Sequence, residues 1–387
     1  MAALLNYSLL IDGIFGAGTT TFSTTATHTN NVIGALNHPT EFGTFKANFI
    51  ARLHRLKTIY NSHPTYLTDI LVQVNEIASA KNWEGAFAEL ATYDHFNQDI
   101  LGARTFIHTP IQPNITLPNT DSYAAECGKS ATNLDGYVED RPLYFDVKCF
   151  KDNVTEILEG IYSELKKHLN TNDVAITAEH QLDISYDDFQ SNRIALLNEL
   201  KAGISATGKP KCFKSTVIPY LSYRFLWGPG ISSVIRTYHP FRHAENFHRT
   251  IFNYASKFIK EKPSIIVLVV FPWYNQVVTN FSNADVELFR ALSRRVFCQY
   301  KYSNELFNVF NSKFKGAETI YEISNYLSGI VFLVDDTILS EHPSKSNVNS
   351  YVYLNPNAVN SVPKSLASDF LMSLGNSAYD DFQYDNY

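Results

Sequence analysis

The 387-residue chain is 45% hydrophobic and 18% charged, and its formal net charge is −6. This composition predicts a globular protein with a substantial core in one large domain or two. Its apolar runs all fall short of the roughly 18 residues that a membrane-spanning helix needs. Met1–Leu10 lacks the basic start of a signal peptide. We therefore expect a cytoplasmic protein without a membrane partner.

Cysteine spacing and net charge indicate which kinds of site the chain can contain. The four cysteines form no C-x-x-C pair and stand at Cys127, Cys149, Cys212 and Cys298. This spacing indicates neither a zinc site nor a disulfide framework, and it fits a reducing compartment. The negative net charge does not argue against nucleic acid, because binding depends on local clusters of Lys and Arg.

Residues 1–80 are expected to form a mainly helical N-terminal region. Apolar residues recur at helical spacing from Glu41 to about Tyr60, and Tyr66–Ala80 supports a second helix. Gly13–Thr20 has the outline of a phosphate-binding G-x-x-x-x-G-K-[ST] loop, but Thr19 stands where that loop has its lysine. A nucleotide site is therefore not expected there.

Asn82–Asp99 is predicted to be a helix that carries an acid among small and aromatic residues. Glu89 lies beside Ala86, Tyr93 and Phe96 on one helical stripe. Such an acid is either a solvated residue at the edge of an apolar face or a side chain directed into a site.

The segment Asn133–Phe150 is predicted to be a β-hairpin. Two alternating apolar runs flank Glu139–Pro142, a cluster of turn-forming residues. With the turn centred there, Val138 pairs with Leu143, and the same register sets Asp135 opposite Asp146. Directly opposed carboxylates repel one another across a strand pair, and a hard cation such as Mg²⁺ relieves that repulsion.

Alternation along the second strand separates apolar residues from polar ones. Asp146 and Lys148 share one face with Tyr144, while Phe145 and Val147 lie on the other. The chemistry is therefore expected on one face and the apolar packing on the other. An acidic face with a lysine is also common on ordinary solvated hairpins, so this face alone does not define a site.

After the hairpin, helical and strand patterns alternate, which predicts an α/β or α+β fold with a central mixed sheet flanked by helices. Helices are predicted at Val154–Leu169, Phe189–Leu200, Phe241–Lys262 and Asp285–Tyr300. Strands are predicted at Val174–Thr177, Ile265–Phe271, Tyr326–Val334 and Tyr351–Leu354. Ile265–Phe271 is apolar without alternation, as in a strand buried on both faces. The end of the chain, from about Gly375, is expected to be a disordered tail.

Two stretches have a local excess of positive charge and are candidates for DNA contact. Lys201–Thr216 is predicted to be a basic loop, with Lys209, Lys211 and Lys214 as its candidates. The helix Asp285–Tyr300 carries the others, Arg290, Arg294 and Arg295. Lysines in such a loop are more often solvated surface than part of a binding site. The histidines at His239, His243 and His248 share no single helical face, so we interpret them as polar surface or DNA contacts rather than metal ligands.

Read together, Glu89, Asp135 and Asp146-Val147-Lys148 resemble the PD-(D/E)xK nuclease superfamily, the fold of many restriction endonucleases. The order of elements agrees over roughly residues 82–271: a helix with Glu, a strand with Asp, a strand with D-x-K, a helix and a buried strand. The chain departs from the usual motif in having Leu134 where proline is common and an Asp at 146 where Glu is commoner.

The resemblance implies a domain organisation. Residues 1–80 would be a helical addition, 81–272 the restriction-endonuclease-like core with an insertion at about 152–239, and 273–387 a C-terminal region packed on the core. The core helix that follows the D-x-K strand is either Val154–Leu169 or Phe241–Lys262.

The resemblance also implies roles for individual residues. Asp135 and Asp146, with the backbone carbonyl of Val147, would ligate Mg²⁺, for which Mn²⁺ would substitute. Lys148 would orient or help deprotonate the attacking water, and Glu89 would hold a second metal or a water.

The implied function is that of a metal-dependent DNA endonuclease, most simply a type II restriction or phage-defence enzyme. A repair, recombination or mobile-element nuclease of the same fold is an alternative, and a non-catalytic DNA-binding protein is another. The expected partner is double-stranded DNA, and the resemblance is compatible with a homodimer and with a cognate methyltransferase.

Overall fold

The computed structural model describes residues 3–26, 28–99, 107–151, 153–171, 173–180, 186–228, 230, 232–236, 240–274, 284–339, 347–372 and 377–382. These residues form two compact units. The first unit comprises 1–150, 249–274 and 293–387, and the second comprises 151–248 and 275–292. No helix within the described ranges is both long and apolar enough to cross a membrane.

The first unit is built around a mixed sheet of seven strands, in the order β1-β2-β3-β8-β9-β10-β11. Their bounds are β1 Gln112–Pro118, β2 Ala131–Val138, β3 Leu143–Cys149, β8 Ser264–Val270, β9 Gly329–Asp335, β10 Val348–Leu354 and β11 Ser377–Asp380. The pairs β3–β8, β8–β9 and β10–β11 are parallel, and the other neighbours are antiparallel. The predicted mixed sheet flanked by helices is therefore confirmed.

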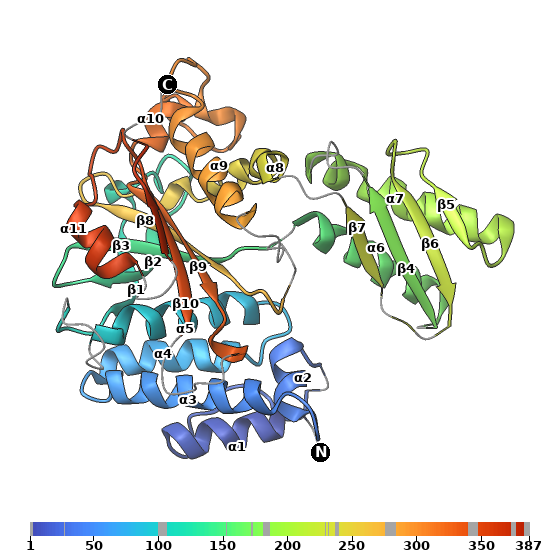
Figure 1. Ribbon diagram of the computed structural model, residues 1–387, viewed down its shortest axis with the longest axis horizontal. Helices are drawn as coiled ribbons and strands as arrows, with labels where there is room; N and C mark the ends of the chain where they lie inside the picture. The colour runs from blue at the N-terminus through green and yellow to red at the C-terminus, as the bar shows by residue number, and fades with distance from the viewer. Residues whose placement is uncertain are drawn as a thin grey trace. The chain divides into compact units, whose positions relative to one another are not determined.

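The N-terminal helices cover one face of this sheet (Figure 1). They are α1 Ala3–Phe15, α2 Asn31–Asn37, α3 Gly43–Tyr60, α4 Pro64–Glu76 and α5 Trp83–Phe96. Phe87 of α5 packs edge-on against Phe271, 5.0 Å between ring centroids, in one core with Val267 and Val331. Residues 1–80 thus share the core of the sheet. All seven residues of β8 are buried, as its unbroken apolar run predicts.

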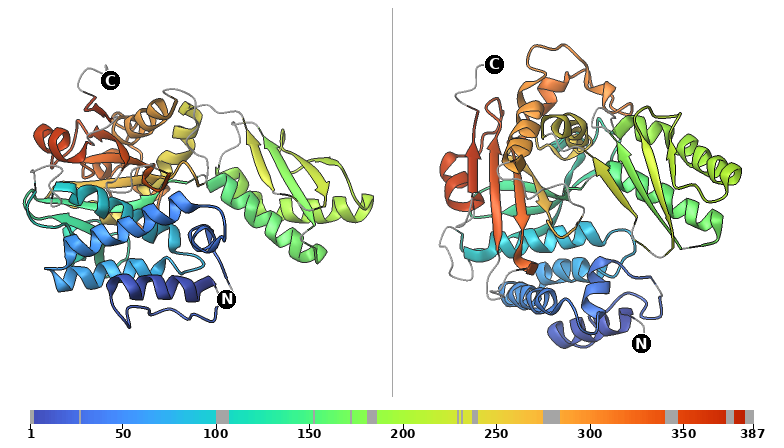
Figure 2. Two further views of the ribbon diagram at one scale, coloured as in Figure 1. Left: turned by 60° about the horizontal axis from the view of Figure 1, so that its bottom comes forward. Right: turned by 45° about the vertical axis from the view of Figure 1, so that its right-hand side comes forward.

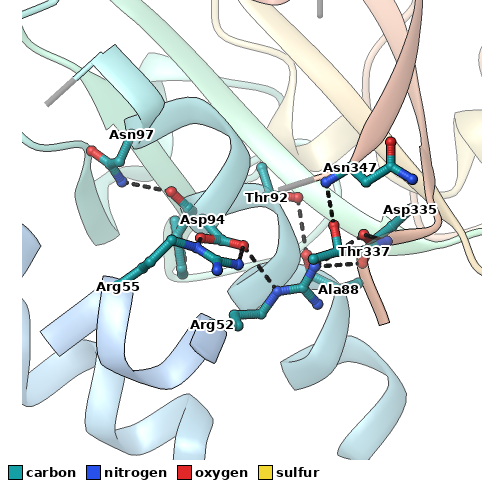
Figure 3. A network of polar contacts seen from close by, with 10 residues as sticks. Arg52, Arg55, Ala88, Thr92, Asp94, Asn97, Asp335, Thr337 and Asn347 are labelled. Carbon is teal, nitrogen blue, oxygen red and sulfur yellow. Dashed lines mark hydrogen bonds and ion pairs between the residues drawn. The ribbon is translucent and has the colours of Figure 1, made fainter. Parts of the chain in front are cut away.

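A network of buried charges joins three elements of the first unit (Figure 3). Arg52 of α3 donates to Asp94 of α5 at 3.1 Å and to Asp335 at the end of β9 at 2.8 Å. Arg55, one helical turn further along α3, also donates to Asp94, at 2.7 Å. Thr337 donates its backbone N–H to Asp335 at 3.1 Å. The two guanidinium groups therefore link the helical layer to the sheet.

The second unit is a smaller sheet of order β5-β6-β4-β7 with two helices along one face (Figure 2). Its elements are α6 Asn153–Leu169, β4 Val174–His180, α7 Tyr186–Thr207, β5 Cys212–Lys214, β6 Ser222–Trp227 and β7 Ser233–Arg236. Alternate residues of β4 and β6, such as Ile176 and Tyr223, pack with Leu158 and Leu196 of the helices. Two further helices, α8 Pro240–Phe252 and α9 Ala284–Cys298, have residues in both units.

Three predictions about elements are wrong, each for a local reason. The basic stretch Lys201–Thr216 is not one loop, because α7 continues to Thr207 with Ile204 in the core of the second unit. The helix ends at Gly208, whose φ of 77° is the left-handed conformation that glycine adopts readily and whose N–H donates to the Ile204 carbonyl.

The helix predicted at Phe241–Lys262 ends at Phe252, and a separate 3-10 turn, η3 Ala255–Lys257, follows. After Phe252, tertiary hydrogen bonds replace helical ones along this backbone. Ser122 donates to the Ser256 carbonyl, and the Lys260 N–H donates to the Asp121 carbonyl. The chain end is not wholly a tail either, because Ser377–Asp380 forms β11 alongside β10.

The histidines also differ from expectation. His243 and His248 are buried at 2% and 7% exposure, so they are not surface residues. His239 lies outside the described residues. Their burial follows from the amphipathic pattern of α8, which turns one side of the helix inward.

Candidate active site

The predicted hairpin register is confirmed. Val138 pairs with Leu143, Tyr137 with Tyr144 and Gly136 with Phe145, so Asp135 and Asp146 come next in the same register. A Cβ atom at Gly136 would lie 2.0 Å from the Phe145 ring, and only glycine leaves room for that ring. Asp135 accepts the Val147 N–H at 2.7 Å, which fixes its carboxylate beside the D-x-K strand.

The strand that carries Asp146 is buried on both sides, unlike the ordinary hairpin with one solvated face that was the alternative interpretation. Phe145 and Val147 belong to the core beneath the N-terminal helices. On the other face, Asp146 is only 1% exposed, because residues around η3 cover it. A buried carboxylate requires cationic or hydrogen-bonding partners, and Asp146 has them.

Helix α5 brings Glu89 to the same end of the sheet. Tyr93 donates its hydroxyl to the backbone carbonyl of Asp135 at 2.5 Å and lies 3.3 Å from the Glu89 carboxylate. This contact joins the helix to the first strand of the hairpin. Glu89 is half-buried and close enough to Asp135 and Asp146 to feel their charges.

The ammonium of Lys148 lies among three oxygen atoms. It is 2.7 Å from the Val147 carbonyl, 2.7 Å from Asp146 Oδ2 and 3.4 Å from Asp135 Oδ2. The ring of Tyr254 lies 5.3 Å away on the η3 side, within range of a cation–π contact. The four predicted side chains, Glu89, Asp135, Asp146 and Lys148, are thus brought together.

A fifth charged residue, Lys257, completes the cluster and was missed by the sequence reasoning. Its ammonium pairs closely with Asp146 Oδ1 and lies 3.9 Å from Asp135 Oδ1. Sequence reasoning placed Lys257 within a continuous helix, Phe241–Lys262, and gave it no role in the site.

The cluster shifts the proton affinities of its acids in different directions. Burial and the charge of Asp135 raise the pKa of Glu89 well above its ordinary value. The same two causes raise the pKa of Asp146 to about 6. Burial acts upward on Asp135 as well, but Lys148 and Lys257 outweigh it and its pKa lies below the ordinary value. Opposed acids of unequal pKa are typical of functional sites.

The oxygen atoms around Lys148 fit a divalent cation. Within the described residues, no three His, Cys, Asp or Glu side chains are already arranged as a metal-binding group. Mg²⁺, however, is commonly held by one or two carboxylates, with water and phosphate oxygens completing its shell. The two Oδ2 atoms and the Val147 carbonyl converge on the Lys148 ammonium, which stands where such a cation would be held.

The candidate DNA contacts differ in exposure. Lys209, Lys211 and Lys214 are exposed, at or beside the edge strand β5 of the second unit. The Lys209 ammonium lies 5.7 Å from the centre of the Trp227 ring. The candidates on α9 are half-buried: Arg290, Arg294 and Arg295. Less of their surface can therefore contact a ligand.

Comparisons with protein-family models, with curated proteins and with solved structures found no match. The interpretation of this cluster therefore depends on its own geometry and on the motif resemblance.

Proposed function

We propose that the protein is a metal-dependent endodeoxyribonuclease that hydrolyses phosphodiester bonds at the cluster of Glu89, Asp135, Asp146 and Lys148. The observation that carries this proposal is the position of the Lys148 ammonium, which lies against two carboxylates and a backbone carbonyl at once. An arrangement of oxygens that holds one cation so closely is suited to hold another. The end of a central strand, covered by helices, provides a rigid support for it.

Each residue has a task in this proposal. The Oδ2 atoms of Asp135 and Asp146 and the Val147 carbonyl would hold Mg²⁺ or Mn²⁺. The ion, when bound, would stabilise negative charge on the phosphate under attack. Lys148, with a long and flexible side chain, would then move from the carboxylates to a phosphate oxygen or to the attacking water. Glu89, whose pKa is raised by burial, would accept a hydrogen bond from that water or bind a second ion.

Double-stranded DNA is the proposed substrate, and a restriction or phage-defence role is the preferred biological setting. Residues 201–240 supply local support, because they contain six Lys and Arg residues and no acid: Lys201, Lys209, Lys211, Lys214, Arg224 and Arg236. Lysines that neutralise phosphates contribute affinity without reading sequence. A repair or mobile-element nuclease of the same fold would share these features.

The decisive experiment is cleavage of plasmid and phage DNA with Mg²⁺ and with EDTA, using wild type and Lys148→Ala. Wild type should cleave only with the metal, and the variant should lose activity by at least about 10³-fold, as expected when a positioned charge is removed from a transition state. Lys167→Ala, an exposed lysine of α6, is the matched control and should cleave normally. Cleavage in EDTA, or by the Lys148 variant, would refute the mechanism.

The same assay separates the alternatives. Fragments of fixed size indicate a sequence-specific restriction enzyme, while a smear indicates a degradative or repair nuclease. A protein that binds duplex DNA but leaves it intact in Mg²⁺ and in Mn²⁺ would be the non-catalytic DNA-binding protein.

The lysines of β5 have their own test. Replacing Lys209, Lys211 and Lys214 by Gln should reduce the slope of log affinity against log salt by about 0.9 for each phosphate that these lysines neutralise. Lys166→Gln with Lys167→Gln, on α6 of the same unit, is the control, because it removes two of the three charges at another place; its change in slope is compared per lysine removed. An unchanged slope would remove these lysines from the DNA surface.

A further inference from the structure

Lys257 reaches the candidate site from a different part of the chain than the D-x-K strand. It closes the short turn η3, and its ammonium pairs with Asp146 Oδ1 and lies 3.9 Å from Asp135 Oδ1. The side chain is 20% exposed, so most of it is enclosed by protein. Asp146 thus has a lysine on each of its two oxygens.

The backbone around Lys257 is fixed by several tertiary hydrogen bonds. Ser122 donates to the Ser256 carbonyl at 2.8 Å, and Lys129 donates to the Ser256 hydroxyl at 2.7 Å. The Lys260 N–H donates to the Asp121 carbonyl at 2.8 Å. A surface lysine that met an acid by chance would not need such anchoring. The fold itself therefore delivers this ammonium to the carboxylates.

The two lysines divide the carboxylate oxygens between them. Lys148 lies against the Oδ2 atoms of Asp135 and Asp146, together with the Val147 carbonyl. Lys257 lies against the Oδ1 atoms. Lys257 pairs directly with Asp146 Oδ1 and places its charge 3.9 Å from Asp135 Oδ1, while the Val147 N–H holds Asp135 through its Oδ2 atom. The direct pair with Lys257 leaves Asp146 Oδ2 on the side of Lys148.

We propose that Lys257 is a positioning residue of the site, which holds Asp146 through its Oδ1 atom, with its charge near Asp135, so that Asp146 Oδ2 is presented to a divalent cation. This inference rests on the proposed nuclease function. The positive charge of Lys257 also repels the cation that Lys257 helps to orient. Lys257 therefore lowers the affinity of the site for the metal, and it raises the turnover of the protein once the metal is bound.

Removing Lys257 should therefore change metal affinity and turnover in opposite directions. In Lys257→Met, loss of a charge about 4 Å from the carboxylates should tighten Mn²⁺ binding on the order of tenfold, given the strength of charge interactions near a protein surface. Turnover at saturating metal should fall about 10- to 100-fold, because Asp146 without its Oδ1 partner holds the cation in unproductive positions. Damage to the fold would instead weaken both properties. Lys257→Arg keeps the charge and should restore weaker metal binding.

The experiment measures Mn²⁺ binding by electron paramagnetic resonance without DNA, and cleavage of plasmid across a range of Mn²⁺ concentrations. Lys260→Met is the matched control, since Lys260 lies on the same segment but pairs with Glu126 at 2.7 Å. It should leave both binding and turnover unchanged. Thermal unfolding of every variant shows whether the fold is kept.

The outcomes separate this inference from the function on which it rests. Weaker or unchanged Mn²⁺ binding by Lys257→Met would overturn the role of Lys257, whatever the protein cleaves. Tighter Mn²⁺ binding by that variant, in a protein that cleaves no DNA, would leave Lys257 beside a metal site and refute the nuclease. A wild type that binds no Mn²⁺ at millimolar concentration would overturn both.

Discussion

Helix α5 contributes acids to two charged clusters, and the two are built differently. Asp94 belongs to the cluster of Arg52, Arg55 and Asp335, while Glu89 belongs to the cluster of acids and lysines. In the first cluster, the side chains of Arg52, Asp94 and Asp335 have no exposed surface and two arginines balance two acids. In the second, three acids face two lysines.

The residue types of the two clusters suit them to different tasks. A guanidinium group is planar, and its forked donors match a carboxylate in a fixed geometry, so the Arg52 cluster has one stable arrangement (Figure 3). Lysine has a compact ammonium on a flexible chain, and the side chains of Lys148 and Lys257 are 24% and 20% exposed. The second cluster therefore retains an excess acid and movable cations, as a site for an incoming charge requires.

The largest expected effect is the loss of cleavage in Asp146→Asn. An amide at this position cannot serve as an anionic ligand, so activity should fall at least about 10³-fold, or roughly 4 kcal/mol in transition-state free energy. The raised pKa of Asp146 favours its neutral form in the fold, so in EDTA the stability of Asp146→Asn relative to wild type should improve as the pH rises from about 4 to 6. Chemical denaturation that instead shows a large loss of stability would make Asp146 a structural residue.

Arg52→Met tests the other cluster. In the protein interior, this variant leaves Asp94 with one arginine instead of two and Asp335 without its paired guanidinium. Because buried acids are left with fewer cationic partners, the free energy of unfolding should fall by about 3 to 5 kcal/mol. Arg55→Met should cost less, because Arg55 is 10% exposed and Asp94 keeps Arg52. Both variants, where folded, should cleave DNA at the wild-type rate. Urea denaturation and the cleavage assay measure the two properties separately.

The clusters should also respond to pH in opposite directions. Burial acts upward on the pKa of Asp94, but Arg55 and Arg52 outweigh it and the pKa is lowered. Asp94 therefore contributes stability above the ordinary Asp pKa of about 3.9, and this contribution is lost as the pH falls through its folded pKa. The pKa of Asp146 is raised to about 6, so the folded state holds its proton longer and stability falls as the pH rises from about 4 to 6.

Comparing each Asn variant with wild type from pH 3 to 8 isolates these contributions. The stability deficit of Asp94→Asn should shrink at the acid end of the range. The stability of Asp146→Asn relative to wild type should improve between about pH 4 and 6 and then remain constant. Parallel curves for both variants would mean that the two clusters are electrostatically alike.

The smallest effect is expected for Tyr93→Phe, which removes the hydroxyl between Glu89 and the Asp135 carbonyl. Loss of one hydrogen bond of this kind should cost about 0.5 to 1.5 kcal/mol of stability. Cleavage should fall less than tenfold, because no group that touches the phosphate is removed. A loss as large as that of Asp146→Asn would show that Tyr93 contacts the substrate.

The part of the site that sequence predicted correctly depends on local periodicity. The register of β2 with β3 follows from alternation on both sides of one turn, and it placed Asp135, Asp146 and Lys148 together. Glu89 followed from its position beside Tyr93 on a helix. Arg52 also had a local signal, because it lies on the apolar stripe of α3 with Phe49 and Leu56.

What sequence could not predict depends on contacts between distant segments. Asp335, the partner of Arg52, lies 283 residues further along the chain. Lys257 fell within the long helix predicted at Phe241–Lys262, which the hydrogen bonds of Ser122 and Lys260 interrupt. Ser377–Asp380 has too few apolar residues for its sequence to predict a strand, and the strand is defined by its pairing with β10.

The larger segment of the second unit, residues 151–248, is inserted between β3 and β8, which has a consequence for biosynthesis. Lys148 leaves the ribosome before this segment and Lys257 after it, with roughly 100 residues between them, which takes on the order of 5 to 20 s to translate. During that interval the hairpin has its acids but neither the neighbouring strand β8 nor the second lysine. The charged cluster therefore cannot be complete before Lys257 has been translated, and a nascent chain that ends before this residue lacks it.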